Sequence, residues 1–166
     1  MSPETSHYPL RIAHIDIARQ PETISFLKKF IRMAAGNGYN GIQFYLEWRV
    51  KTESMPTRNT EETWYTEQEM RSVAAFARSL GMELIPVVSI LSCASQILRL
   101  PRFRHLAELR SSPAGGRFHS HSLSMMCPSL PEVFQTVSRY LAEISDIFPG
   151  RFFHAGCDEM WEFGQC

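Results

Sequence analysis

Apolar residues along the chain alternate between short continuous runs and longer stripes at helical spacing. The short runs are rich in isoleucine, valine and phenylalanine, occupy residues 11–17, 41–46, 83–90 and 151–156, and predict β-strands. Between them, apolar residues recur every three or four positions over about 22–35, 66–80 and 129–148, which predicts amphipathic helices. The predicted order of elements is therefore β-α-β-α-β-α-β.

Polar and turn-forming residues mark the ends of these predicted elements. Thr66 with Glu69, and Ser129 with Glu132, have the S/T-x-x-E spacing of a capping box, which predicts a helix start at each place. Pro86 lies within the third predicted strand, and because proline lacks a backbone N–H we expect a bulge or an irregular strand end there.

Strands that alternate with amphipathic helices predict an α/β fold whose strands pair in parallel through right-handed crossovers. Both an open doubly wound sheet and a (β/α) TIM-barrel type of fold fit this order. No strand is followed by G-x-G-x-x-G or G-x-x-x-x-G-K-[ST], so the usual nucleotide-binding arguments for the open sheet are missing. The polar stretch 47–65 is long for a connector, and such loops are often functional.

Composition is that of an ordinary globular domain. The chain has 166 residues, of which 44% are hydrophobic and 20% are charged, and its formal net charge is +0. A balanced charge gives no electrostatic case for binding nucleic acid or an anionic membrane. No apolar run is long enough to span a bilayer, and the tail over residues 1–10 lacks the apolar region of a secretory signal.

The cysteines and loop histidines point away from metal binding. The four cysteines form no C-x-x-C pair, so we expect free thiols in a reducing compartment, a cytoplasmic location and no zinc site. His119 and His121 flank Ser120 in a polar stretch, where solvated loop histidines are expected rather than metal ligands.

Functional groups in parallel α/β folds collect at the carboxyl ends of strands, and the fourth predicted strand has the richest end. Asp158 and Glu159 follow it directly, and Trp161 comes two residues later. Adjacent side chains in an extended segment point in different directions, which suits one carboxyl as a proton donor and the other as an orienting group. Trp161 offers an aromatic surface on which a sugar ring can pack. The alternative is that the two acids only cap the next helix.

Residues 153–159 (FHAGCDE) resemble the H-x-G-[GC]-D-E signature of family-20 glycoside hydrolases, the β-N-acetylhexosaminidases, and most closely the hexosaminidase D branch. Other stretches agree in order. Residues 11–19 (RIAHIDIAR) are similar to the family's R-G-x-x-x-D-x-[SA]-R first strand, residues 65–70 (YTEQEM) to its Y-T-x-x-E-[IM] helix start, and residues 84–86 (LIP) to its V-I-P third strand.

The resemblance implies a (β/α) barrel and a substrate-assisted retaining reaction on N-acetylhexosamine glycosides, without a cofactor. It implies that Glu159 is the general acid and base and that Asp158 orients the substrate's acetamido group. Substrate-binding roles follow for Arg11, Trp161, Glu47 and His154. Three of these have alternatives: a surface charge for Arg11, a loop charge for Glu47, and a core histidine for His154.

Two departures from the family pattern qualify this prediction. Ser92-Cys93 stands where the family has a glycine followed by the histidine that supports the acid, and Ser89 stands where many relatives have aspartate. A full barrel needs about 250 residues and eight strands, whereas about four βα units are predicted here. We therefore expect residues 11–166 to be the N-terminal half of a catalytic barrel. The alternative is a catalytically inactive fragment that binds sugar or another protein.

Overall fold

The computed structural model describes residues 8–55, 64–110 and 124–166, and its elements alternate between strands and helices. In chain order they are β1 (Ile12–Asp16), α1 (Ile24–Gly36), β2 (Gly41–Tyr45), α2 (Glu67–Ser79), β3 (Glu83–Val87), α3 (Ser95–Leu98), the 3-10 turn η1 (Arg104–Leu106) and α4 (Pro131–Ile147). The predicted α/β class is confirmed. The predicted histidines His119 and His121 lie outside the described residues.

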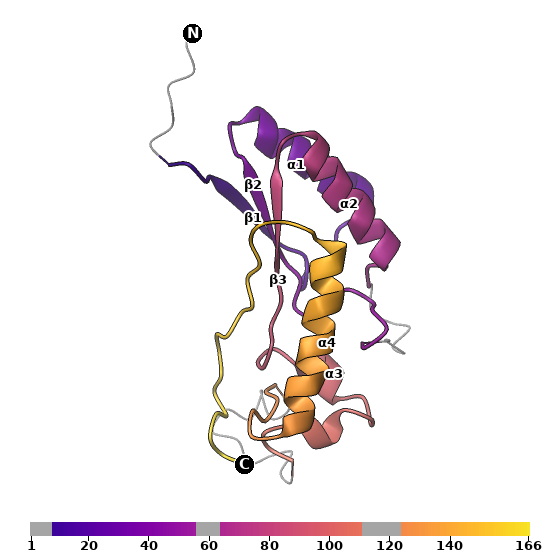
Figure 1. The fold of residues 1–166 in the computed structure, drawn as a ribbon, viewed down its shortest axis with the longest axis vertical. Coiled ribbons are helices and arrows are strands. Elements are labelled where there is room, and N and C mark those ends of the chain that lie inside the picture. Colours follow the sequence, from indigo (N-terminus) through magenta and orange to yellow (C-terminus); the bar gives the residue numbers. More distant parts are fainter. Residues whose placement is uncertain (1–7, 56–63, 111–123) are drawn as a thin grey trace.

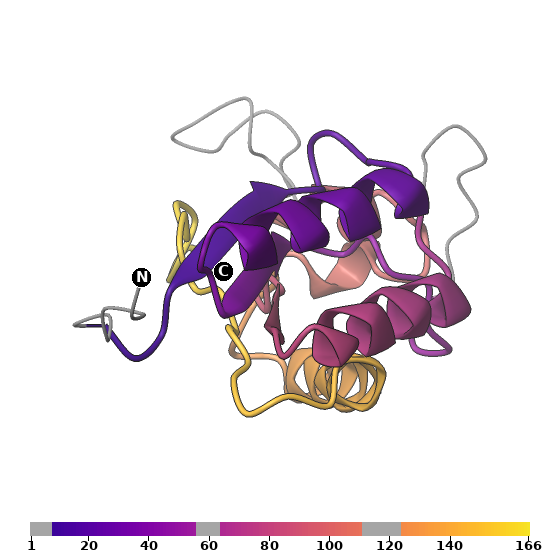
Figure 2. The ribbon, with the colours of Figure 1, turned by 90° about the horizontal axis from the view of Figure 1, so that it is seen from above.

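The sheet has three parallel strands in the order β1-β2-β3. The register aligns Ala13 of β1 with Ile42 of β2, and Ile42 with Leu84 of β3. These residues belong to the apolar core or pack against it. Helices α1, α2 and α4 follow one another around the sheet, with α2 between the other two (Figures 1 and 2). The sheet therefore has one face that is covered by a layer of helices.

The predicted fourth strand is reduced to one parallel bridge between Val87 and His154. The chain after α4 turns and runs back beside β3 (Figure 1), where the His154 N–H donates to the Pro86 carbonyl at 3.0 Å. The N–H and C=O of one strand residue face the same neighbouring strand. Pro86 therefore has no N–H to donate to this segment. Regular pairing consequently cannot extend back towards Phe152. Four full βα units are not found among the described residues. Pro86 stops the pairing on the Phe152 side, and on the other side the Gly156 N–H donates to His154 Nδ1 and not to β3.

The two predicted capping boxes have different outcomes. At α2 the Thr66 hydroxyl accepts from the Glu69 N–H at 3.2 Å, and the Glu69 carboxylate accepts from the Thr66 N–H at 2.8 Å, so this prediction is confirmed. The box at Ser129 is wrong. Helix α4 begins at Pro131, whose ring fixes a helical φ without needing a cap, and the Glu132 carboxylate instead pairs with His105 at 3.0 Å.

The core continues below the carboxyl end of β2. Trp48 and Tyr140 of α4 are fully buried and stack with their ring centroids 4.9 Å apart. The Tyr140 hydroxyl donates to the Glu47 carbonyl at 3.3 Å, which fixes the backbone just after β2. Helix α4 therefore supports the edge of the sheet at which functional groups were expected. Among the described residues, no helix is both long and apolar enough to cross a membrane.

Candidate active site at the carboxyl edge of the sheet

Three residues at the carboxyl edge of the sheet have a left-handed backbone. They are Glu47 after β2 (φ 46°), Cys93 after β3 (φ 50°) and Glu159 after the bridged segment (φ 52°), and they are the only non-glycine residues with positive φ in the described part of the chain. This conformation costs roughly 1–2 kcal/mol for a residue with a side chain. Such strain clusters at functional sites, because there it serves to aim side chains.

An ion-pair network joins the ends of β1 and β2. The Arg19 guanidinium donates to the Asp16 carboxylate at 2.9 Å and lies 3.3 Å from the Glu47 carboxylate. The other oxygen of Asp16 accepts from the backbone N–H groups of Ala18 and Arg19, at 3.0 and 3.1 Å. The turn after β1 therefore presents Arg19 to the end of β2.

Tyr45, the last residue of β2, lies in the same network. The Arg19 guanidinium carbon sits 5.0 Å from the Tyr45 ring centroid, and the Tyr45 hydroxyl is 3.9 Å from the Cys93 sulfur. Burial raises the pKa of Tyr45 to about 12. The hydroxyl therefore keeps its proton at neutral pH and serves as a neutral hydrogen-bonding group between β2 and the loop after β3.

Cys93 connects this network to Glu159. The Cys93 thiol donates to the Glu159 carboxylate with a sulfur–oxygen distance of 3.7 Å. Burial raises the pKa of Cys93, and the carboxylate of Glu47 adds to that shift, so the sulfur keeps the proton that it donates. The resemblance described above places a histidine that supports the acid at this position. In this chain a thiol makes the contact with Glu159 instead.

The electrostatics of Glu47 are set mainly by its burial. Only 8% of the residue is exposed. Burial raises the pKa of Glu47, and the positive charge of Arg19 offsets this shift only in part. Burying the ionised Glu47 carboxylate therefore costs free energy in the folded state. A solvent-exposed loop glutamate, the alternative considered for Glu47, would carry no such cost.

A glutamine at position 47 is expected to stabilise the fold at neutral pH. Glu47 binds its proton more tightly in the folded state than in the unfolded state, because its pKa is raised by folding. The stability that protonated Glu47 contributes is therefore fully present below the ordinary pKa of glutamate, and it is lost as pH rises through the raised pKa. The free energy of unfolding of Glu47→Gln, measured in urea, should match the wild type near about pH 4 and exceed it at about pH 7. Glu53→Gln, at an exposed glutamate in the loop after β2, is the control, and a Glu47→Gln variant less stable at neutral pH would contradict the argument.

Asp158 and Glu159 are both exposed on the segment that follows Gly156. A Cβ atom on Gly156 would lie 2.6 Å from the Val88 carbonyl oxygen, so only glycine lets this segment approach the end of β3 so closely. No helix follows the two acids in the described chain up to Cys166, and a short turn occupies residues 161–164. The alternative that these acids cap a helix is therefore not what the structure has.

The other predicted site residues lie in different places. Arg11 is at the amino end of β1, where its guanidinium donates to the carbonyls of Gly38 and Tyr8, both at 2.7 Å, so it is at the opposite edge from Glu159. His154 is exposed rather than a core histidine, and its Nδ1 accepts from the Gly156 N–H at 3.2 Å. Trp161 is 46% exposed, two residues past Glu159.

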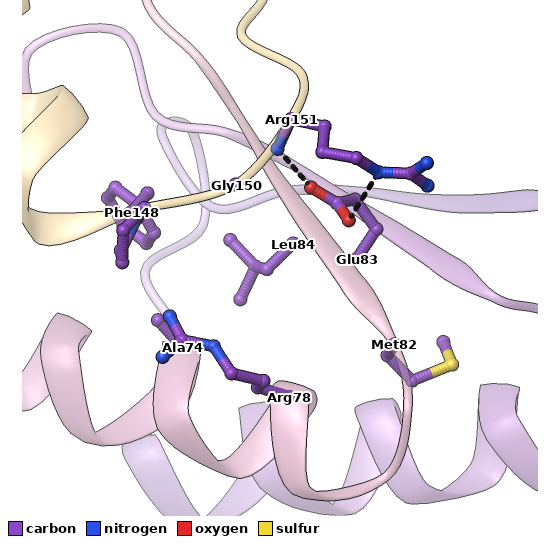
Figure 3. A pocket seen from close by; sticks show the side chains of 9 residues that line it. Ala74, Arg78, Met82, Glu83, Leu84, Phe148, Gly150 and Arg151 are labelled. Atoms are coloured by element: carbon purple, nitrogen blue, oxygen red, sulfur yellow. Dashed lines mark hydrogen bonds and ion pairs between the residues drawn. The ribbon is translucent and has the colours of Figure 1, made fainter.

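Described residues line two cavities that are separate from these carboxylates. The larger, about 390 Å³, lies at the amino edge of the sheet, where Glu83 of β3 pairs with Arg151 at 3.5 Å (Figure 3). The smaller, about 240 Å³, lies between the loop after β3 and the apolar face of α4 around Val137. Neither of these two cavities is lined by Asp158 or Glu159.

Sequence reasoning did not assign functional roles to Asp16, Arg19, Tyr45 or Cys93. One signal was available for the first three. Asp16 and Tyr45 end adjacent parallel strands in direct register, and Arg19 follows three residues after Asp16, so all three were bound to meet at one edge. Cys93 had a weaker signal, its place after the third strand. Of the predicted residues, Glu159 contacts Cys93 directly, and the charges of Glu47 and Asp158 help to raise the pKa of the Cys93 thiol.

Comparison with known proteins finds relatives that match most of this chain. The chain is 27% identical over 177 residues to a "Beta-hexosaminidase" of Akkermansia muciniphila, covering 93% of this chain and 36% of the relative. It is 23% identical to "Hexosaminidase D" of Bos taurus, covering 94% and 42%. The chain thus spans less than half the length of these relatives.

Solved structures show the same fold. An exo-β-N-acetylglucosaminidase of Vibrio harveyi superposes with a TM-score of 0.77 at 22% identity, over 93% of this chain and 28% of that one. A β-N-acetylhexosaminidase of Streptomyces coelicolor gives 0.75 at 20% identity, over 96% and 35%. Residues 8–165 match the catalytic domain of glycosyl hydrolase family 20, and the chain therefore belongs to that family.

Proposed function

We propose that the protein containing this chain is a β-N-acetylhexosaminidase that uses a substrate-assisted retaining mechanism, and that residues 11–166 form the N-terminal half of its catalytic barrel. The observation that carries the proposal is the convergence of Glu47, Cys93 and Glu159, each held in a left-handed conformation, on one edge of a parallel sheet. Membership of family 20 supplies the class of reaction.

In this mechanism the bond between the anomeric carbon and the leaving oxygen breaks while the substrate's acetamido oxygen bonds to that carbon. Glu159 gives its proton to the leaving oxygen and then takes a proton from the water that reopens the cyclic intermediate. Asp158 orients the acetamido group and stabilises the positive charge that develops on it. Holding that neighbouring group in place is a proximity effect with a ceiling of ~7–11 kcal/mol.

The remaining residues of the edge have supporting roles in this proposal. In the proposal the Cys93 thiol positions the Glu159 carboxyl, and Glu47, paired with Arg19, accepts a hydrogen bond from a sugar hydroxyl. Trp161 offers a half-exposed aromatic surface to the sugar ring. Arg11 and His154 stay predicted substrate-binding residues. A cytoplasmic location also stays a prediction.

The choice of substrate tests the mechanism. The purified protein should hydrolyse a nitrophenyl N-acetyl-β-glucosaminide and leave the matching nitrophenyl β-glucoside intact, because the glucoside lacks the acetamido nucleophile. Equal rates of hydrolysis of both substrates would show that the acetamido group is not needed. They would contradict substrate assistance and favour an ordinary two-carboxylate mechanism. If neither is cleaved but N-acetylglucosamine binds saturably, the chain acts as a sugar-binding module, which is the alternative function.

A further inference from the structure

A second cluster of reactive side chains lies away from the carboxyl edge. Glu108, Cys127 and Cys166 place one carboxylate oxygen and two sulfur atoms within 4.8 Å of one another. Cys127 is fully buried and Glu108 is 2% exposed, whereas Cys166 is exposed. No sequence pattern indicated this cluster, and no zinc site was expected, because its members are far apart in the chain and form no C-x-x-C pair.

Backbone pairing brings two of these residues together, and the third arrives from the segment that follows Glu159. Ala107 and Met126 form an antiparallel bridge, with the Glu108 N–H donating to the Met125 carbonyl at 2.9 Å. The segment is tied to Glu108 by the Gln165 and Cys166 N–H groups, which donate to its Oε1 at 2.8 and 3.2 Å. Three separate stretches of chain therefore meet at the cluster.

One oxygen of this buried carboxylate has no hydrogen-bond partner among the described residues. Oε1 of Glu108 accepts the two backbone bonds, and its Oε2 is buried and unsatisfied. A buried carboxylate oxygen that lacks a partner costs the fold several kcal/mol in principle and is normally satisfied by a cation or a donor.

The chemistry of the three ligand atoms selects the cation. Two thiolates and a carboxylate form a donor set suited to zinc, which binds sulfur at roughly 2.3 Å and oxygen at roughly 2.0–2.2 Å. In a tetrahedral site such ligand atoms stand roughly 3.3–3.8 Å apart. The Cys127 and Cys166 sulfurs are 3.1 Å apart, so small side-chain rotations open the space required.

We propose that Glu108, Cys127 and Cys166 bind a zinc ion that clamps the segment carrying Asp158 and Glu159 to the loop after η1. Binding releases the two thiol protons to solvent and leaves a fourth coordination position outside these three ligands. The proposal does not rest on the glycosidase assignment.

Zinc titration of the purified chain under reducing conditions tests the site. One zinc per chain is expected by elemental analysis, and cobalt in its place should give the thiolate charge-transfer absorption of a cysteine-bound metal. Cys166→Ser, at an exposed position, should lower zinc affinity by more than ~100-fold, beyond what loss of an outer-shell partner costs. Glu108→Gln should weaken binding as well, while Cys157→Ser, at an exposed cysteine outside the cluster, should bind as the wild type does.

Circular dichroism shows whether each variant is folded. A substitution at buried Cys127 could disrupt the fold, whereas Cys166 is exposed, so Cys166→Ser tests the site in a folded protein. Zinc affinity that is unchanged in Cys166→Ser overturns the proposal. So does a folded, reduced protein that binds no zinc, or a Cys127–Cys166 disulfide that forms in place of metal binding and is found by mass spectrometry of alkylated peptides.

Discussion

Replacing Glu159 by glutamine is expected to lower kcat/KM for N-acetyl-β-glucosaminides by ~10²–10⁴-fold, which is the usual contribution of a positioned general acid and base. Glutamine keeps the size of the side chain and the hydrogen-bonding position opposite Cys93 but has no proton to transfer. The loss therefore reports chemistry rather than folding. Steady-state kinetics of the wild type and of Glu159→Gln, with Glu67→Gln as the control for a distant exposed glutamate, measure it.

The size of the loss should depend on the leaving group. A nitrophenolate departs with little help from an acid, whereas the alkoxide of an N-acetylglucosamine disaccharide needs full protonation. Glu159→Gln should therefore lose more activity on the disaccharide than on the nitrophenyl glycoside. Equal losses on both would mean that Glu159 acts in binding or structure, and unchanged activity on both would remove it from the reaction.

Sequence periodicity was enough to predict the three strands and three long helices of the described chain. The pattern that predicts each of them involves only residues close together in the sequence. The apolar runs at Ile12–Asp16, Gly41–Tyr45 and Glu83–Val87 alternate with amphipathic stripes, and the capping box at Thr66 closes locally. Such patterns depend on neighbours within about four positions. The α/β class could therefore be predicted from the printed sequence alone.

Two local predictions had outcomes that depend on a proline or a distant partner. Pro86 was expected to make a bulge or an irregular strand end; β3 pairs regularly and ends at Val87, one residue after Pro86, and the missing N–H limits pairing of the fourth segment. Ser129 and Glu132 had the spacing of a capping box, but Pro131 starts the helix and His105 takes the Glu132 carboxylate. The segment around His154 that faces Pro86, and His105 that pairs with Glu132, are both too distant in sequence for a local pattern to reveal the contact.

The candidate site could be predicted in part. Glu47 and Glu159 were chosen because each follows a strand, and parallel strands end at one edge. The Cys93 contact with Glu159 joins residues 66 positions apart, and the Cys127–Cys166 contact joins residues 39 apart, so neither has a sequence signature. Arg11 was chosen on resemblance alone, and the fold places it at the amino edge.

A Gly156→Ala substitution is expected to destabilise the protein by about 2–4 kcal/mol, because it combines an overpacked contact with an unfavourable backbone conformation. The added Cβ would lie 2.6 Å from the Val88 carbonyl oxygen, and the backbone on which it sits has a φ of 34°. Backbone atoms cannot rotate away as a side chain can. The segment from His154 to Glu159 must therefore move off the end of β3.

Gly81→Ala separates the two causes. Gly81 has a φ of 70° with nothing within 4 Å of the added Cβ, so this control carries only the conformational cost of roughly 1–2 kcal/mol. Urea unfolding of both variants should show the larger loss of unfolding free energy for Gly156→Ala. The contact between the Cys93 thiol and the Glu159 carboxylate should also be lost in Gly156→Ala. Its activity should therefore fall further than the loss of stability alone would require. Equal destabilisation of the two variants would mean that the segment bearing the acids is not pressed against β3, and that Glu159 is not held at the carboxyl edge by this glycine.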